Sequence, residues 1–223
     1  MILRFFTKVL GDLFFIIGLG IALFTYAPII YSEVVYQLKV GGLIYSEPKK
    51  EILSSEQLNS QSNLQENSFD YENIESTTPV SQDFDVIIDK ISVNAPVVAN
   101  VDITNEKSYM EALRSGVAHA GGTALPGQNG NMFIFAHSSL NFWQLGPYAT
   151  VFNLLSKLEI GDTVVIYYEG KGYVYSIFET SIVHGWNTKP FDQEYAEPVV
   201  TLVTCDPPGT TQNRRVVKGR LVL

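Results

Sequence analysis

The run Val-Val-Thr-Leu-Val-Thr-Cys at residues 199–205 is the segment that most restricts the fold of this chain. β-Branched and aliphatic residues fill it, which is typical of a buried strand. The sequence Asp-Pro-Pro-Gly at residues 206–209 ends the strand at once, because a proline has no amide hydrogen to donate to a neighbouring strand. The strand therefore brings Cys205, the only cysteine in the chain, to the point where a loop begins.

Similar short segments recur from residue 84 to the end of the chain, each bounded by turn residues. A helix with Ser108 as its N-cap is expected at residues 108–115, and a second short helix at residues 151–155. Pro96 makes the second predicted strand an edge strand or a bulged one. Strands linked by turns, with few helices, predict a mainly β fold, a closed or nearly closed β-barrel. The predicted strands are residues 84–88, 93–98, 131–136, 162–169, 173–183, 199–205 and 213–219.

The amino-terminal part of the chain predicts a membrane anchor. Residues 13–32 carry no charge, and about 20 such residues form a helix that crosses a bilayer. Arg4 and Lys8 precede the run, so the positive-inside bias leaves the amino terminus in the cytoplasm and the rest of the chain outside. We assign residues 1–45 to a cytoplasmic terminus and a single-pass transmembrane anchor. The alternative is a cleaved signal peptide, and it also places the folded domain on the exported side.

The composition changes between the anchor and the predicted strands. Ser, Asn, Gln and Glu dominate residues 46–82, and such a segment buries too little apolar surface to offset the entropy of ordering it. We predict a flexible polar linker there, followed by a catalytic domain over residues 83–223.

The charge and the cysteine count exclude several classes of site. A net charge of −8 argues against a nucleic-acid partner. One cysteine excludes an internal disulfide and a zinc site built from thiolates alone. The three histidines show no metal-ligand spacing, so we expect no cofactor, while calcium dependence stays open.

Three side chains could together perform acyl transfer. Cys205 can supply the nucleophile, and His137, which follows the predicted strand 131–136, can supply the proton donor. Arg214 can stabilise an oxyanion, because its guanidinium is always charged and carries five donors. Arg214 and Arg215 must take opposite faces of their strand, so only one of them can point at the site. The short connection between the last two strands places Arg214 near Cys205.

The same three regions resemble the sortases, the cysteine transpeptidases of bacterial cell surfaces. Thr-Leu-Val-Thr-Cys at residues 201–205 matches the Thr-Leu-x-Thr-Cys motif of that family, and residues 123–137 resemble the run that leads into its essential histidine. Arg214 stands where the family places its arginine. The resemblance covers residues 83–223 and implies an eight-stranded sortase-type barrel. Ala136 replaces the family's usual glycine and Ser138 its common basic residue, so the subclass is open.

The resemblance also implies a reaction. Cys205 would attack the Thr–Gly bond of a Leu-Pro-x-Thr-Gly-like sorting signal and form a thioacyl enzyme, with His137 as the acid and base and Arg214 at the oxyanion. Thr204, one residue before the nucleophile, could orient the substrate or the site through its hydroxyl, and we assign it to substrate or oxyanion binding. The implied partners are surface proteins that carry the signal and an amine acceptor such as a cell-wall precursor or a pilin lysine.

Other interpretations remain open on sequence grounds. The same fold could act as a cysteine endopeptidase that hydrolyses the intermediate, or it could be a non-catalytic barrel that binds peptides. An L,D-transpeptidase is disfavoured, because its His-Gly-Cys-Arg cluster is absent around Cys205. For His119 we expect a structural role. Trp186 could line a substrate groove, although we favour packing for it.

Overall fold

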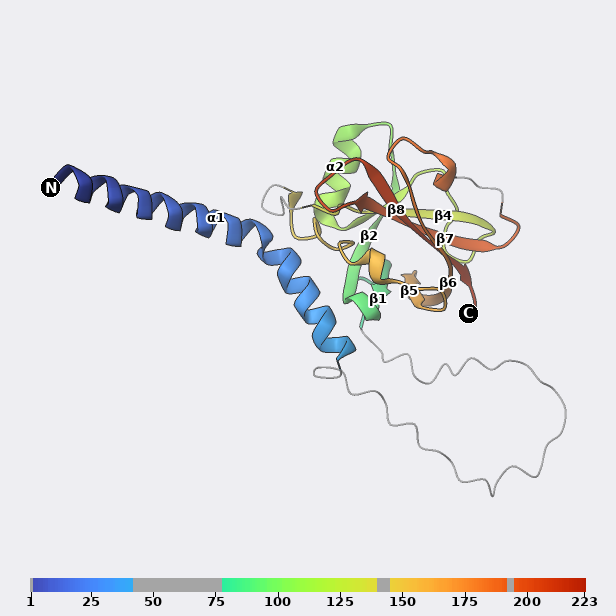
Figure 1. The fold of residues 1–223 in the computed structure, drawn as a ribbon. Coiled ribbons are helices and arrows are strands. Elements are labelled where there is room, and N and C mark those ends of the chain that lie inside the picture. Colours follow the sequence, from blue (N-terminus) through green and yellow to red (C-terminus); the bar gives the residue numbers. More distant parts are fainter. Residues whose placement is uncertain (1, 42–77, 140–144, 192–194) are drawn as a thin grey trace, which may run out of the picture.

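A long helix leads to a β-barrel in this chain (Figure 1). The structure, a computed structural model, describes residues 2–41, 78–139, 145–191 and 195–223. The predicted linker therefore lies outside the described residues except for its last five, residues 78–82. These five lie against the barrel. Val80 N donates to Asn94 Oδ1 (3.1 Å), and Ser81 N donates to Asp85 Oδ2 (3.0 Å).

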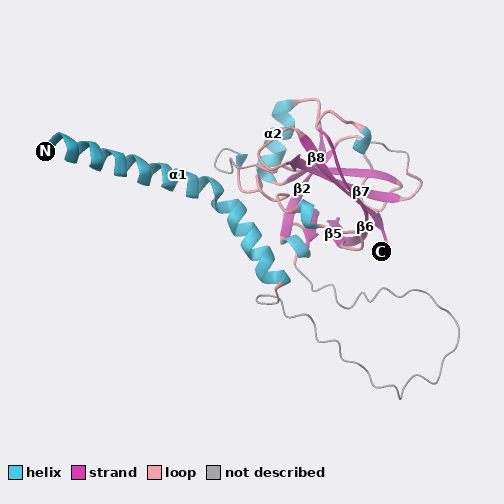
Figure 2. Cartoon of the chain, in the orientation of Figure 1, coloured by secondary structure: helices cyan, strands magenta, loops and turns pink. Residues whose placement is uncertain are grey.

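Eight strands close the barrel in the order β1-β2-β3-β4-β7-β8-β6-β5, which confirms the predicted mainly β fold. Figure 2 shows the strands of this domain in magenta, beside helix α1 (Ile2–Val40). The β2–β3 and β4–β7 pairs are parallel, and the other pairs are antiparallel. The strands are β1 Phe84–Ile88, β2 Val93–Val101, β3 Val117–Ala120, β4 Gly130–Phe135, β5 Thr163–Tyr168, β6 Lys171–His184, β7 Pro198–Asp206 and β8 Asn213–Leu221.

Alternation along β7 and β8 divides their side chains between two apolar clusters. Val200, Leu202 and Val217 belong to the main hydrophobic core, which includes side chains from most of the strands. Val203 and Val216 belong to a second, smaller cluster on the opposite face of the same strands, together with Phe133 of β4. Because side chains alternate along a strand, Cys205 must share the face of Val203.

The helices differ in detail from the prediction. Helix α2 is Glu106–Ser115, and its N-cap is Asn105, whose side chain accepts a hydrogen bond from Ser108 N. Ser108 is therefore inside the first turn and is not the cap. The predicted helix at residues 151–155 is a series of turns that leads into the 3₁₀ helix η3 Leu155–Lys157. The other 3₁₀ turns are η2 Asp89–Ile91 and η4 Lys189–Phe191.

Pro96 does not mark a sheet edge, because a closed barrel has none. Strand β2 pairs with β1 on one side and with β3 on the other. The irregularity of β2 lies between Val98 and Val101, where Asn100 has a φ of 55°. A bulge is thus present in this strand, but a few residues beyond the proline.

Helix α1 Ile2–Val40 contains the predicted apolar segment. Its window Leu10–Ala27 is long enough to cross a membrane, has a mean hydropathy of 1.9 and is not buried by the rest of the structure. The helix bends partway along its length and its first half points away from the barrel (Figure 1). Pro28 lies in its interior, where a missing amide hydrogen favours a bend.

The close contact at Gly116 generates a stability prediction. A Cβ atom there would lie 2.1 Å from the backbone oxygen of Pro96, whereas a Cβ at Gly172 would find only ordinary contacts with Tyr167 at 3.6 Å. Gly116→Ala should lower the free energy of unfolding by about 1–3 kcal/mol through overpacking. Gly172→Ala is the matched control and should change it much less. Equal effects of the two substitutions in thermal or chemical unfolding would contradict this packing.

Candidate active site

Cys205 and Arg214 face each other across the last pair of strands. Cys205 is the penultimate residue of β7, and the antiparallel register pairs it directly with Arg214, the second residue of β8. Directly opposed residues on antiparallel strands have Cβ atoms about 4.5–5.5 Å apart. Both side chains lie on the face of Val203 and Val216, outside the main core. The structure therefore places these two groups together, as the short connection predicts.

His137 reaches the same place from the other side of β7. Strands β4 and β7 run parallel, with Phe135 in register with Val203. The pairing continues past the end of β4, because Ala136 N donates to Val203 O at 3.1 Å. Two residues further along each chain, His137 comes level with Cys205. The three predicted side chains therefore come from three adjacent strands, in the order β4, β7, β8.

The environment of His137 favours a neutral imidazole. Burial lowers the pKa of His137, because the charged form loses its hydration there. Its Nε2 atom is buried and has no hydrogen-bond partner among the described residues. This nitrogen is available to accept or deliver a proton.

Arg214 is held by the loop that joins β7 to β8. Its Nη1 donates to Thr211 O at 3.2 Å and to Asn213 O at 3.1 Å. Within the described part of the chain, Nη2 and Nε form no hydrogen bond, so donors remain for a ligand. Gly185 permits this arrangement: a Cβ there would lie 2.5 Å from Thr211 O and 3.2 Å from Nη1 of Arg214.

Of the two roles predicted for Thr204, its position suits orientation of the site better than contact with the substrate. Its hydroxyl is buried and donates to Ala136 O at 2.9 Å. Because Thr204 precedes Cys205 on a strand, its side chain takes the opposite face and points away from the thiol. The hydroxyl therefore cannot orient a substrate at the sulfur. It binds the segment that carries His137 to β7.

Arg215 also takes the opposite face. Its Nη2 lies 2.7 Å from Oδ2 of Asp206, an ion pair that is not aligned as a hydrogen bond. Only a fifth of each of these two side chains is exposed. The expectation that one arginine alone can point at the site agrees with this geometry, and Arg214 is that arginine.

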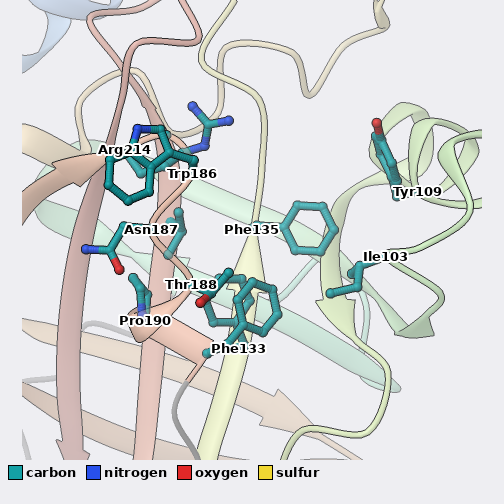
Figure 3. A pocket seen from close by; sticks show the side chains of 12 residues that line it. Ile103, Tyr109, Phe133, Phe135, Trp186, Asn187, Thr188, Pro190 and Arg214 are labelled. Atoms are coloured by element: carbon teal, nitrogen blue, oxygen red, sulfur yellow. The ribbon is translucent and has the colours of Figure 1, made fainter.

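An apolar pocket of about 350 Å³ adjoins these groups. Figure 3 shows Arg214 and Trp186 on one side of it, Tyr109 on the other, and Phe133 and Phe135 between them. Trp186 is 82% exposed and stacks on His184 with a centroid distance of 5.7 Å. It therefore lines the pocket, the alternative role predicted for it, and is not packed in the interior. Val203, two residues before Cys205 on the same face, also lines the pocket.

His119 is a structural residue, as expected. It is fully buried, and its Nδ1 accepts a hydrogen bond from Asn100 N at 3.2 Å. Nε2 must then carry the proton, and it lies 3.0 Å from Ala124 O and 2.8 Å from Thr123 Oγ1. Both ring nitrogens are satisfied. Among the described residues, no group of three His, Cys, Asp or Glu side chains could hold a metal ion.

The barrel is similar to solved structures of sortases. The chain is similar to a Clostridium perfringens sortase D5 transpeptidase, with 26% identity, a TM-score of 0.51, and coverage of 63% of this chain and 78% of that one. It is similar to sortase C1 of group B Streptococcus pilus island 1, with 28% identity, a TM-score of 0.53, and coverage of 63% of this chain and 64% of that one. It is also similar to sortase C1 of Streptococcus suis, with 27% identity, a TM-score of 0.52, and coverage of 64% of this chain and 74% of that one.

No curated protein matches the sequence. The family described as the sortase domain matches residues 86–222, which is more than half of the chain and nearly the whole barrel. The barrel topology, the position of Cys205 beside His137 and Arg214, and this match lead to one assignment: the chain belongs to the sortase family.

Proposed function

We propose that this sortase is a cysteine transpeptidase that cleaves an Leu-Pro-x-Thr-Gly-like sorting signal between Thr and Gly and joins the new carboxyl end to an amine. The observation that supports this best is the register of β7, which sets Cys205 opposite Arg214 and level with His137. A nucleophile, a proton carrier and a cationic donor on one face are the groups that acyl transfer needs.

The first half of the reaction forms a thioester. The sulfur of Cys205 attacks the threonine carbonyl carbon, and the thiol proton passes to Nε2 of His137. Arg214 stabilises the oxyanion with the donors that its loop contacts leave unused. The C–N bond to glycine then breaks, and His137 returns the proton to the departing amine.

The second half transfers the acyl group. An incoming amine attacks the thioester carbonyl, His137 takes one of its protons, and the C–S bond breaks to restore Cys205. The proton then returns to the sulfur, so the enzyme is unchanged after one cycle. These steps use three side chains of this chain and no cofactor.

The pocket beside the site suits the apolar part of such a signal. Aromatic and aliphatic side chains line most of it, and Arg214 stands at one side, which matches an apolar peptide segment that leads to a reacting carbonyl. The acceptor would be an amine at the cell surface, such as a cell-wall precursor or a pilin lysine. One of the similar enzymes is named for a pilus island, which is consistent with a pilin acceptor. The apolar segment of α1 would anchor the enzyme in the cell membrane, with the barrel outside.

The rival function is hydrolysis of the same intermediate, which would make the protein an endopeptidase. Mass spectrometry of the products, with and without added glycine amines, separates the two. In a transpeptidase, amine and water compete for the thioacyl intermediate, so the amine adduct should replace the hydrolysed product as the amine concentration rises. If added amine did not lower the amount of hydrolysed product, the transpeptidase function would be contradicted.

The nucleophile and the oxyanion partner can be tested by substitution. Cys205→Ala should abolish turnover, because the chain has no other thiol. Arg214→Lys should lower kcat by about 100–1000-fold, since a lysine keeps the charge but loses the planar fork. Arg215→Lys is the matched control on the opposite face and should have a much smaller effect. Equal losses at the two arginines would contradict the proposed role of Arg214.

The protonation state of His137 gives a further prediction. Because burial disfavours the imidazolium, its titration midpoint should lie below the ordinary histidine value of about 6.5, so the ring is neutral at pH 7. The chain has three histidines, and His137→Gln identifies the signal that belongs to this residue in an NMR titration. A midpoint above 6.5 in the substrate-free enzyme would contradict the neutral resting state.

A further inference from the structure

The second half of α1 is in contact with the barrel. Lys157 Nζ lies 2.9 Å from Oε1 of Glu33 and 5.3 Å from the centre of the Tyr36 ring. One turn further along the helix, Lys39 Nζ donates to Asp89 O at 3.3 Å. Glu33 and Lys157 are 124 residues apart in the sequence, so tertiary contacts rather than neighbouring positions in the chain bring them together.

These contacts follow one stripe of the helix. Every residue from 10 to 24 is exposed, whereas residues 32, 33, 35, 36, 38 and 39 are half-buried, a spacing that repeats with the helical period. Tyr36 packs against the main hydrophobic core of the barrel. A shallow pocket between helix and barrel is lined by Tyr31 and Val35 on one side and by Ile91 and Thr150 on the other.

The barrel touches the helix with the same end that carries the active site. An antiparallel pairing reverses the strand direction and a parallel pairing keeps it. Between β1 and β7 the direction is reversed twice, so β1, β4 and β7 run the same way and all finish at this end. Cys205 lies at the end of β7, and the turn η2 follows the end of β1. The segment with Thr150 and Lys157 precedes β5, which also begins at this end. In the closed order of the strands, β1 and β7 lie on opposite sides of the barrel. The helix contacts the side of β1, so it leaves the pocket beside Cys205 uncovered.

The distance between these contacts and the membrane is short. The apolar window of α1 ends at Ala27, and the contacts run from Tyr31 to Lys39. At 1.5 Å per residue, they lie about 6–18 Å along the helix beyond the window. The headgroup layer on one side of a bilayer occupies several ångströms of that span.

We propose that the second half of α1 is a docked stalk that holds the active-site end of the barrel within about 20 Å of the bilayer, and that the enzyme thereby selects polypeptides whose scissile bond lies at that height above the same membrane. The proposal rests on the proposed transpeptidase function and on α1 crossing the bilayer. A fixed height matters because the effective concentration of a tethered substrate is greatest when its tether matches the distance to be spanned.

The test uses the full-length enzyme in liposomes with sorting-signal peptides attached to a transmembrane helix by flexible Gly/Ser spacers. Spacers of about 10 and about 60 residues have mean spans of about 18 Å and about 43 Å. The wild-type enzyme should process the short-spacer substrate about tenfold faster, following the fall of effective concentration with tether length. A soluble peptide with the same signal reports on the active site alone.

Charge reversal tests whether docking sets this preference. Lys157→Glu and Glu33→Lys should each remove most of the spacer preference and leave turnover of the soluble peptide unchanged. The double variant Glu33→Lys/Lys157→Glu should restore the preference, because it rebuilds the ion pair with its signs exchanged. Lys171→Glu is the matched control, since Lys171 also lies over a tyrosine ring, at 5.0 Å from Tyr173, but at the opposite end of the barrel.

Docking has a readout that does not depend on activity. In a Cys205→Ala background, Val35→Cys with Thr150→Cys should be joined by a short bifunctional thiol reagent, whereas Val35→Cys with Lys171→Cys should not. Absence of the first cross-link, or a wild-type enzyme indifferent to spacer length, would overturn the stalk while leaving the transpeptidase intact. Failure to process even the soluble peptide would instead contradict the proposed function, and the cross-link would still decide the docking.

Discussion

The pairing of β7 with its two neighbours is the constraint on which the site depends. Parallel pairing with β4 brings His137 level with Cys205, and antiparallel pairing with β8 sets Arg214 opposite. Side chains alternate along a strand, so a slip of one residue in β8 would exchange Arg214 for Arg215 and send the needed guanidinium to the other face. In the proposed mechanism, the backbone register of β7 and β8 therefore determines which arginine faces the thiol.

Buried polar contacts help to fix that register. Thr201 Oγ1 donates to Asn131 Oδ1 at 2.6 Å, and Asn131 Nδ2 donates to Pro190 O at 2.8 Å. The first of these bonds joins β7 to β4, and the second holds η4 on the outside of the sheet. There the ring of Phe191 stacks on that of Phe133, with 3.8 Å between the ring centroids. Thr204 adds a third bond near the site. An unpaired polar group in this interior would cost free energy, so slipped pairings that break these bonds are disfavoured.

Local patterns were enough to predict the strands that carry the site, because Cys205 and His137 each follow an apolar run and proline or polar residues mark where it ends. Alternation alone could also have placed Thr204 on the far face from Cys205. Strand β3 was not recognised, since its four residues, Val-Ala-His-Ala, are too few and too small to give a signal. The exposure of Trp186 and the contact between Glu33 and Lys157 depend on tertiary packing between distant segments, which no local pattern contains.

The most direct measurement of the central claim is the mass of the enzyme during turnover of a sorting-signal peptide. If Cys205 is the nucleophile, the enzyme should gain a covalent adduct on Cys205 as one glycine-bearing fragment is released. The mass gain should equal the mass of the substrate peptide minus that of the released fragment. Rapid mixing and peptide mapping would locate the adduct. Product formation without that adduct, or an adduct on any other residue, would contradict an active centre built on the end of β7.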